Sequence, residues 1–104
     1  MLQRAVKRGD DIPVDVLRVR RGVNAALLPD AVITWKLYDR TNAVIASGNA
    51  TLQEPLTAHF QLNVPKAITG VFELLGDYRL DIIHTYDGKQ VTKSFSLKAV
   101  DNVA

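Results

Sequence analysis

The chain has 104 residues, a formal net charge of +2 and 47% hydrophobic against 23% charged residues. These values predict one globular domain, 1–104, with a modest core, and they exclude a disordered chain. The sequence has no cysteine, which excludes disulfides and cysteine-based chemistry. It shows neither a bilayer-length apolar run nor a signal-peptide pattern, so we expect a protein made in the cytoplasm without membrane contact.

The first segment, residues 2–7, predicts an edge strand, because neither of its faces is apolar enough to be buried. Residues 8–11 (Arg-Gly-Asp-Asp) predict a turn, in which glycine frees the backbone and aspartate bonds to its neighbours. The Arg-Gly-Asp tripeptide also matches an integrin-type adhesion motif, but three common surface residues meet easily by chance, so we favour the turn.

Apolar and polar residues alternate from Ile12 to Val16, which predicts a second strand. Pro13 has no N–H to donate and therefore belongs at a strand start or on an edge. The apolar phase shifts at Leu17 and Val19, and a β-bulge near Val16 or Leu17 would explain this shift. Residues 22–31 then predict a connecting loop.

Basic residues are concentrated in this first part of the chain. Six of the thirteen lie in the first 21 positions: Arg4, Lys7, Arg8, Arg18, Arg20 and Arg21. They fit a solvated surface or a surface for an acidic protein partner. Nucleic acid is not expected as a partner, because no aromatic residue is interleaved with them for base stacking.

The middle of the chain predicts three strands. Residues 32–39 contain the only tryptophan, Trp35, whose apolar neighbours at a spacing of two favour a core position over ligand stacking. Residues 43–51 contain the small residues Ala46, Ser47, Gly48 and Ala50, which suit an edge strand or the close approach of another backbone. In residues 57–64 we expect an inner face formed by Ala58, Phe60, Leu62 and Val64.

Residues 65–75 predict a short helical crossover, since Pro65 can start a helix and Ile68, Phe72 and Leu75 follow at i, i+4 and i+7. The crossover leads to Tyr78 at the start of a late strand, the position of the tyrosine corner in Greek-key sandwiches.

The C-terminal third predicts a long hairpin. Residues 78–85 and 91–99 alternate with a period of two, with Tyr78, Leu80, Ile82 and His84 on one face of the first run and Val91, Lys93, Phe95, Leu97 and Ala99 on one face of the second. Asp87-Gly88 between the two runs suits a type I′ turn. In total, the pattern predicts an all-β fold: an immunoglobulin-like antiparallel β-sandwich of about seven strands, with a short helical crossover near residues 65–75.

Candidate catalytic and metal-binding residues are few. We expect His59 at the surface and His84 partly buried, and the two histidines lie 25 positions apart without a carboxylate at ligand spacing. The glycines form no phosphate-binding loop and the serines lie in no nucleophile elbow. We therefore expect no enzyme activity, no metal and no cofactor.

The order of the motifs resembles small immunoglobulin-like domains of tailed-bacteriophage structural proteins, and it is similar to the amino-terminal domain of baseplate upper proteins. The resemblance rests on residues 7–14 with Gly9-Asp10, residues 31–39 with Trp35, residues 44–50, Gly76-Asp77-Tyr78 opening residues 75–82, and a closing strand that ends at Val100. It implies a virion structural role, with location in the virion and docking onto tail, baseplate, fibre or head, and no catalysis.

Two binding hypotheses remain. In the first, the chain docks onto other phage structural proteins or copies of itself, with an exposed edge strand as the contact. Its candidate partner-binding residues are Leu2, Arg4, Val6, Lys7, Arg18, Arg20, Arg21 and Tyr38. In the second, the fold is a carbohydrate-binding or host-adhesion module, for which the available aromatic residues are Tyr38, Tyr86 and Phe72.

Overall fold

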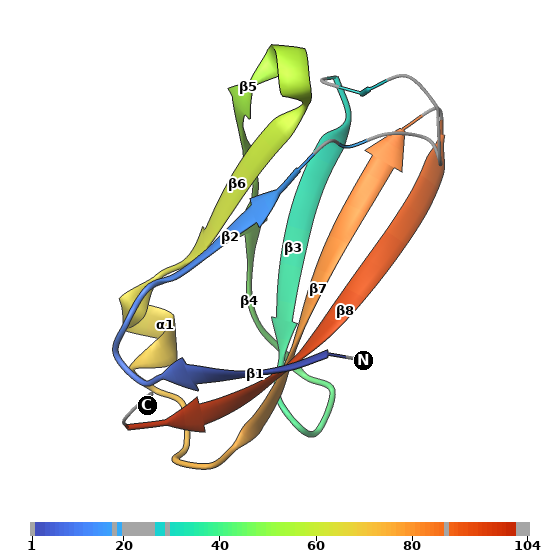
Figure 1. Cartoon of the computed structure of the whole chain (residues 1–104). Coiled ribbons are helices and arrows are strands. Elements are labelled where there is room, and N and C mark those ends of the chain that lie inside the picture. Colours follow the sequence, from blue (N-terminus) through green and yellow to red (C-terminus); the bar gives the residue numbers. More distant parts are fainter. Residues whose placement is uncertain (1, 18, 20–26, 29, 87, 102–104) are drawn as a thin grey trace.

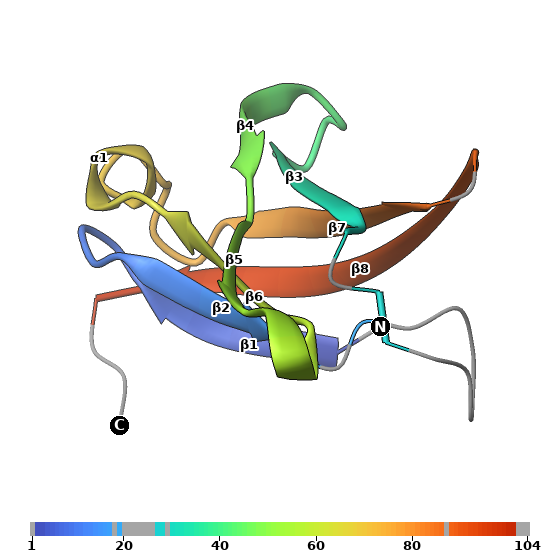
Figure 2. The same cartoon turned by 90° about the horizontal axis from the view of Figure 1, so that it is seen from above.

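The computed structural model describes residues 2–17, 19, 27–28, 30–86 and 88–101, which form two facing β-sheets (Figures 1 and 2). The elements are β1 (Leu2–Lys7), β2 (Ile12–Val16), β3 (Val32–Tyr38), β4 (Val44–Asn49), β5 (Thr51–Glu54), the 3₁₀ helix η1 (Pro55–Thr57), β6 (His59–Val64), α1 (Lys66–Thr69), β7 (Asp77–Tyr86) and β8 (Lys89–Val100). The strand order is β1-β8-β7-β3-β4 in the larger sheet and β2-β6-β5 in the smaller one. The predicted all-β sandwich is confirmed.

This strand order is that of an immunoglobulin-like sandwich. The strands β2, β6 and β5 correspond to B, E and D of that fold, β3, β7 and β8 to C, F and G, and β4 to C′. Leu80 lies two residues after Tyr78, where antibody domains carry the second cysteine of their inter-sheet disulfide. Packing of side chains therefore holds the two sheets together here.

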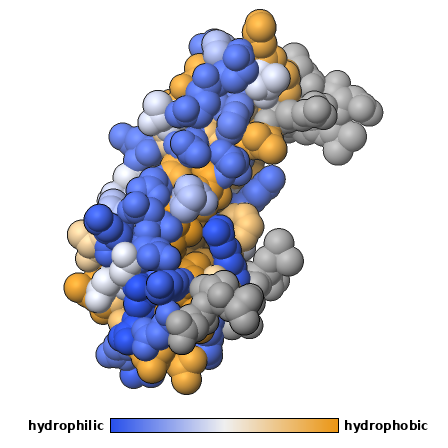
Figure 3. All heavy atoms as spheres, turned by 60° about the vertical axis from the view of Figure 1, so that its left-hand side comes forward, coloured by the Kyte–Doolittle hydropathy of each residue, from blue (hydrophilic) through white to orange (hydrophobic). Residues whose placement is uncertain are grey.

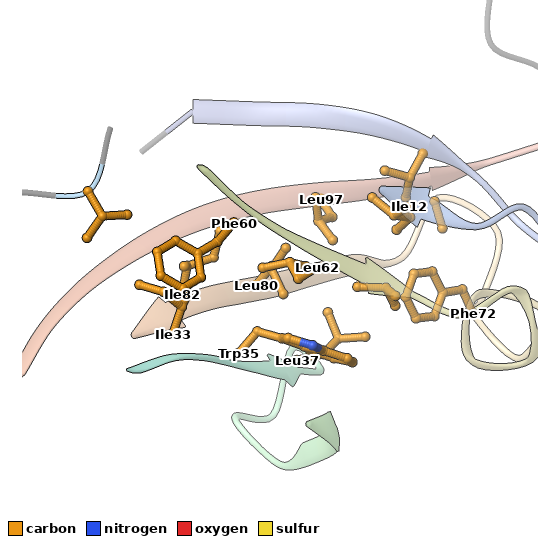
Figure 4. Close-up of a cluster of buried hydrophobic side chains, with 14 of the residues drawn as sticks. Ile12, Ile33, Trp35, Leu37, Phe60, Leu62, Phe72, Leu80, Ile82 and Leu97 are labelled. Atoms are coloured by element: carbon orange, nitrogen blue, oxygen red, sulfur yellow. The ribbon is translucent and has the colours of Figure 1, made fainter. Parts of the chain in front are cut away.

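The core lies between the two sheets, and Figure 4 shows its side chains meeting there. Trp35 is buried as predicted, and so are the four inner-face residues predicted in residues 57–64. A Cβ atom at Gly48 of β4 would lie 2.7 Å from Nε1 of Trp35. Of the two alternatives for these small residues, the edge strand is confirmed, and the close approach at Gly48 is made by the Trp35 side chain instead of another backbone, which favours glycine at this point.

The strand β1 lies at a sheet edge, as predicted, but it pairs in parallel with β8, from Leu2 opposite Phe95 to Lys7 opposite Val100. The expectation of a purely antiparallel sandwich is wrong for this pair. The turn at residues 8–11 carries the chain into the other sheet, so β1 has no hairpin partner and runs in the same direction as β8. Gly9 has φ +85° in this turn, which explains the glycine.

The described residues contain eight strands, one more than expected. The segment 43–51, predicted as one strand, is divided: β4 belongs to the larger sheet and β5 to the smaller one. The switch occurs at Ala50, whose N–H donates a hydrogen bond of 2.8 Å to the carbonyl oxygen of Ile33. Apolar periodicity does not reveal such a switch, because both strands continue the same extended pattern.

The predicted irregularity after β2 is present. Val16 lies opposite Phe60, and the N–H of Val19 donates a hydrogen bond of 3.3 Å to the carbonyl oxygen of Ala58. The step from Val16 to Val19 is one residue longer than the step from Phe60 to Ala58, so the pairing shifts by one residue here, as a β-bulge requires. Arg18 itself lies outside the described residues.

The crossover at residues 65–75 contains the four-residue helix α1 and a tyrosine corner. The N–H of Glu73 donates a hydrogen bond of 2.8 Å to the Tyr78 hydroxyl oxygen, and the Tyr78 ring stacks on Phe72 with 4.0 Å between the ring centroids. Phe72 is buried, whereas Leu75 is exposed, because the chain leaves the helical path after α1 and Leu75 adopts φ +60°.

The hairpin predicted for the C-terminal third is confirmed. The strands β7 and β8 pair from Asp77 opposite Lys98 to Tyr86 opposite Lys89, which leaves two residues in the turn. Gly88 has φ +73°, as the predicted turn type needs, and Asp87 lies outside the described residues.

Candidate interaction surface

The outer face of the larger sheet, directed away from the core, is polar. Alternation along the strands places on it Ala5 and Lys7 of β1, Thr92, Ser94, Ser96 and Lys98 of β8, Asp77, Arg79, Asp81 and Ile83 of β7, Thr34, Lys36 and Tyr38 of β3, and Ser47 of β4. Opposite charges lie near one another on neighbouring strands: Lys98 Nζ is 3.2 Å from Asp77 Oδ1. We refer to this set of side chains as the outer face.

At the centre of the outer face, Asp81 is 8% exposed, and one of its carboxylate oxygens accepts two hydrogen bonds. Its Oδ1 accepts hydrogen bonds from Ser94 Oγ at 2.7 Å and from Arg79 Nε at 3.1 Å. The same guanidinium lies over the Tyr38 ring at 4.1 Å and donates a bond of 2.9 Å to Asn42 Oδ1. These contacts satisfy the buried charge and tie three strands and a turn together, so they give the outer face a fixed shape.

The β1 edge beside the outer face carries two of the predicted partner-binding residues, Arg4 and Lys7, and both are exposed. Val6 is buried against the core, so the prediction that it contacts a partner is wrong: it faces the same side as Ala99, its neighbour on β8. Leu2 contributes its backbone to β1, and its side chain lies outside the described part of the chain. Arg18, Arg20 and Arg21 also lie outside the described residues.

Tyr38, the remaining predicted residue, shares the outer face with β1 but lies three strands away, on β3. The registers place Tyr38 next to Arg79, Arg79 next to Ser96, and Ser96 next to Gln3 of β1. The structure thus brings Tyr38 and β1 onto one sheet face. However, the stacked guanidinium covers one side of the Tyr38 ring, which makes Tyr38 a structural residue of that face.

The role of Arg8 could not be predicted from the sequence. Its Nε and Nη2 both lie 2.8 Å from Oδ1 of Asp101, which is 93 residues further along the chain. This contact raises the pKa of Arg8 and lowers the pKa of Asp101. The turn prediction for the Arg-Gly-Asp tripeptide is confirmed, and the adhesion alternative loses support because the guanidinium is engaged within the domain.

The two histidines lie apart. His59 Nε2 is 3.0 Å from Asp15 Oδ1 at the surface of the smaller sheet, and His84 is buried between the sheets with 8% of its surface exposed. Within the described part of the chain, no group of three or more histidine, cysteine, aspartate or glutamate side chains could hold a metal ion.

A groove of about 340 Å³ lies at the end of the molecule where the turn between β3 and β4 meets residues 71–78. Its acidic rim includes Asp39, whose carboxylate accepts bonds from Thr41 and from the N–H of Ala43, and these bonds lower the pKa of Asp39. That carboxylate caps a turn.

Figure 3 shows the molecule from the side of the smaller sheet, where a hydrophilic band is flanked by apolar atoms at both ends.

The aromatic residues considered for carbohydrate binding are mostly engaged in the fold. Phe72 is 2% exposed and stacked on Tyr78, and Tyr38 is stacked with Arg79. Tyr86 is half-buried at the end of β7. A sugar-stacking platform needs open aromatic faces, so this second hypothesis keeps little support from these three side chains.

No helix in the described residues is long and apolar enough to cross a membrane. No protein-family model matches the sequence, and no curated protein matches it. Among solved structures, the chain is similar to extracellular domains 3–5 of Drosophila OTK, with 10% sequence identity and a TM-score of 0.38. The match covers 98% of this chain and 33% of that one, so the chain spans about a third of the length of this neighbour.

Proposed function

We propose that the chain is a non-enzymatic structural component of a tailed-phage virion that acts by protein–protein docking. The observation that carries the docking function is the β1 edge beside the rigid outer face. In the described residues, β1 pairs only with β8, so the backbone groups along its other side have no strand partner. Such an edge is a template for an added strand from another chain.

The chemistry of this edge favours an acidic partner. Arg4 and Lys7 are exposed on β1, and neither has a carboxylate within ion-pair distance among the described residues. Two copies of β1 placed side by side would bring these cations together, which is unfavourable. A segment with aspartate or glutamate would gain both backbone hydrogen bonds and charge attraction.

The phage part of the proposal is supported by the sequence resemblance, whose motifs fall on recognisable elements. Residues 7–14 span the turn between β1 and β2, Trp35 lies in β3, and Gly76-Asp77-Tyr78 opens β7 at the tyrosine corner. A virion module of this kind needs a rigid scaffold and a docking surface and no reactive site.

The test is mass spectrometry of density-banded particles from the phage or prophage that encodes the chain. The proposal predicts the protein in intact particles in a fixed ratio to a major structural protein. Its absence from banded particles, when it is abundant in the infected cell, would overturn the virion role.

A further inference from the structure

A second hollow lies on the seam between the two sheets, away from the outer face. It has a volume of about 150 Å³ and lies between the end of β2 and the middle of β8. Its lining is largely apolar, with three ionisable residues: Val14, Asp15, Val16, Leu17, Ile82, His84, Lys93 and Phe95. We call it the His84 pocket. A volume near 150 Å³ holds a ligand of about six heavy atoms, the size of one side chain.

His84 is the unexplained group in this pocket. It is 8% exposed, its Nε2 is fully buried, and that nitrogen has no hydrogen-bond partner among the described residues. Leaving a buried polar atom unpaired costs on the order of 1–3 kcal/mol, so native structures rarely keep one without a reason. A leucine would pack against Ile82 and Phe95 without that cost.

Lys93 gives the pocket its charge. It is exposed, and no described carboxylate lies within ion-pair distance of it. Asp15, the carboxylate that lines the pocket, makes no ion pair with Lys93, and its Oδ1 lies 3.0 Å from His59 Nε2 and 3.4 Å from Gln61 Nε2.

The backbone beside the pocket is also available. The strand β8 has twelve residues, but β1 pairs only with Phe95–Val100, so among the described residues no strand lies along the other side of Lys89–Ser94. An extended segment could pair there as a continuation of β1. Its side chains would alternate, and one of them would be directed toward the seam.

We propose that an extended, acidic segment of a partner protein pairs with the free half of β8 and inserts one glutamate or aspartate side chain into the His84 pocket, where Lys93 and the His84 imidazole bind its carboxylate. This inference rests on the docking function proposed above and names the chemistry of the partner. The apolar walls contact the methylene stem, and the carboxylate accepts charge-assisted hydrogen bonds at its tip.

Binding of a carboxylate is coupled to the proton of His84. Burial, and secondarily the charge of Lys93, lower the pKa of His84 in the free protein. A bound carboxylate favours the imidazolium, so it raises that pKa, and affinity increases as the pH falls through the pKa of the bound state and levels off below the pKa of the free protein. The other ionisable group lining the pocket, Asp15, is present in both states and keeps its bonds to His59 and Gln61.

The experiment uses NMR of the folded protein with a capped five-residue peptide that has a central glutamate between valine and threonine residues. The sequence has only two histidines, so the ring signals of His84 are read beside those of His59 as an internal reference. The glutamate peptide should shift the His84 ring and the amides of residues 89–94 saturably, more tightly at pH 6 than at pH 8. The same peptide with glutamine should bind at least about tenfold more weakly, which corresponds to the loss of one charge-assisted contact.

Two variants keep the test independent of folding. His84→Leu should abolish the preference for glutamate over glutamine, and the surface change Lys93→Gln should reduce that preference without affecting the fold. The inference would be overturned if both peptides bound equally, or if no saturable shift appeared at millimolar peptide. It would also be overturned if both variants kept the wild-type preference for the glutamate peptide over the glutamine peptide. Propionate or inorganic phosphate binding as tightly as the glutamate peptide would show a site for free anions and would also overturn it. If the peptides do not bind but the protein is found in banded particles, the His84 inference fails and the proposed virion role remains supported.

Discussion

Replacing Gly48 by alanine tests how β4 packs on the core. The added Cβ would lie 2.7 Å from Nε1 and 2.9 Å from Cε2 and Cζ2 of Trp35, closer than real Cβ atoms come to their neighbours. Trp35 is 5% exposed and held by the core, so the edge strand β4 must shift instead. Such overpacking costs about 1–3 kcal/mol, and the lower chain entropy of alanine offsets part of it, so we expect a net loss of about 1–2 kcal/mol.

The assay is urea unfolding followed by tryptophan fluorescence, which reports on this contact because Trp35 is the only tryptophan. For a domain of this size the loss lowers the melting temperature by about 4 °C or more. Ser47→Ala, one residue away on the exposed side of β4, is the matched control and should change stability by less than about 0.5 kcal/mol. A Gly48→Ala protein with wild-type stability and an unchanged emission spectrum would refute the packing of Trp35 against β4.

Two further predictions concern single side chains. Tyr78→Phe removes the acceptor of the 2.8 Å bond from the Glu73 N–H but keeps the ring on Phe72, so we expect the free energy of unfolding to fall by about 1 kcal/mol in the same assay. Burial lowers the pKa of His84 in the folded state below its ordinary value of 6.5, which the unfolded chain keeps. The unfolded chain therefore binds more protons near this pH, and stability falls as the pH is lowered from about 7.5 to about 5.5. Unfolding of the His84→Leu protein should lack this part of the pH dependence and should need more urea at neutral pH; an unchanged slope would contradict the burial of His84.

Local patterns were sufficient for much of the fold. The alternation in residues 57–64, the Asp-Gly turn and the tyrosine at the start of β7 each depend on residues near in sequence, and the structure confirms them. The one-sided burial expected in residues 78–85 is wrong, because β7 is an inner strand of the larger sheet and both of its faces are buried from Leu80 to His84. The parallel pairing of β1 with β8 and the switch of sheets at Ala50 depend on contacts between distant segments. A strand has the same apolar–polar alternation whichever sheet it joins and whether it pairs in parallel or antiparallel. The local sequence therefore does not determine sheet membership or strand direction.

Some features of the candidate surface could likewise be predicted from the local sequence, and others could not. Exposed charge on β1 could be predicted, because an edge strand with Arg4 and Lys7 has no other place for them. The burial of Val6 and the engagement of Arg8 with Asp101 could not, since both depend on β8 and on the residue just beyond its end. The His84 pocket was missed for a further reason: it is formed by the seam between β2 and β8, which exists only once the two sheets face each other.

The most direct test of the account is whether the basic β1 edge carries the protein into particles. We would compare banded particles made with wild-type protein, with Arg4→Glu plus Lys7→Glu, and with the control pair Arg40→Glu plus Lys66→Glu, which makes the same charge change at exposed sites outside β1. The account predicts that the β1 variant is folded but depleted from particles, while the control is present at the wild-type level. Incorporation of the β1 variant at the wild-type level would contradict docking through this edge.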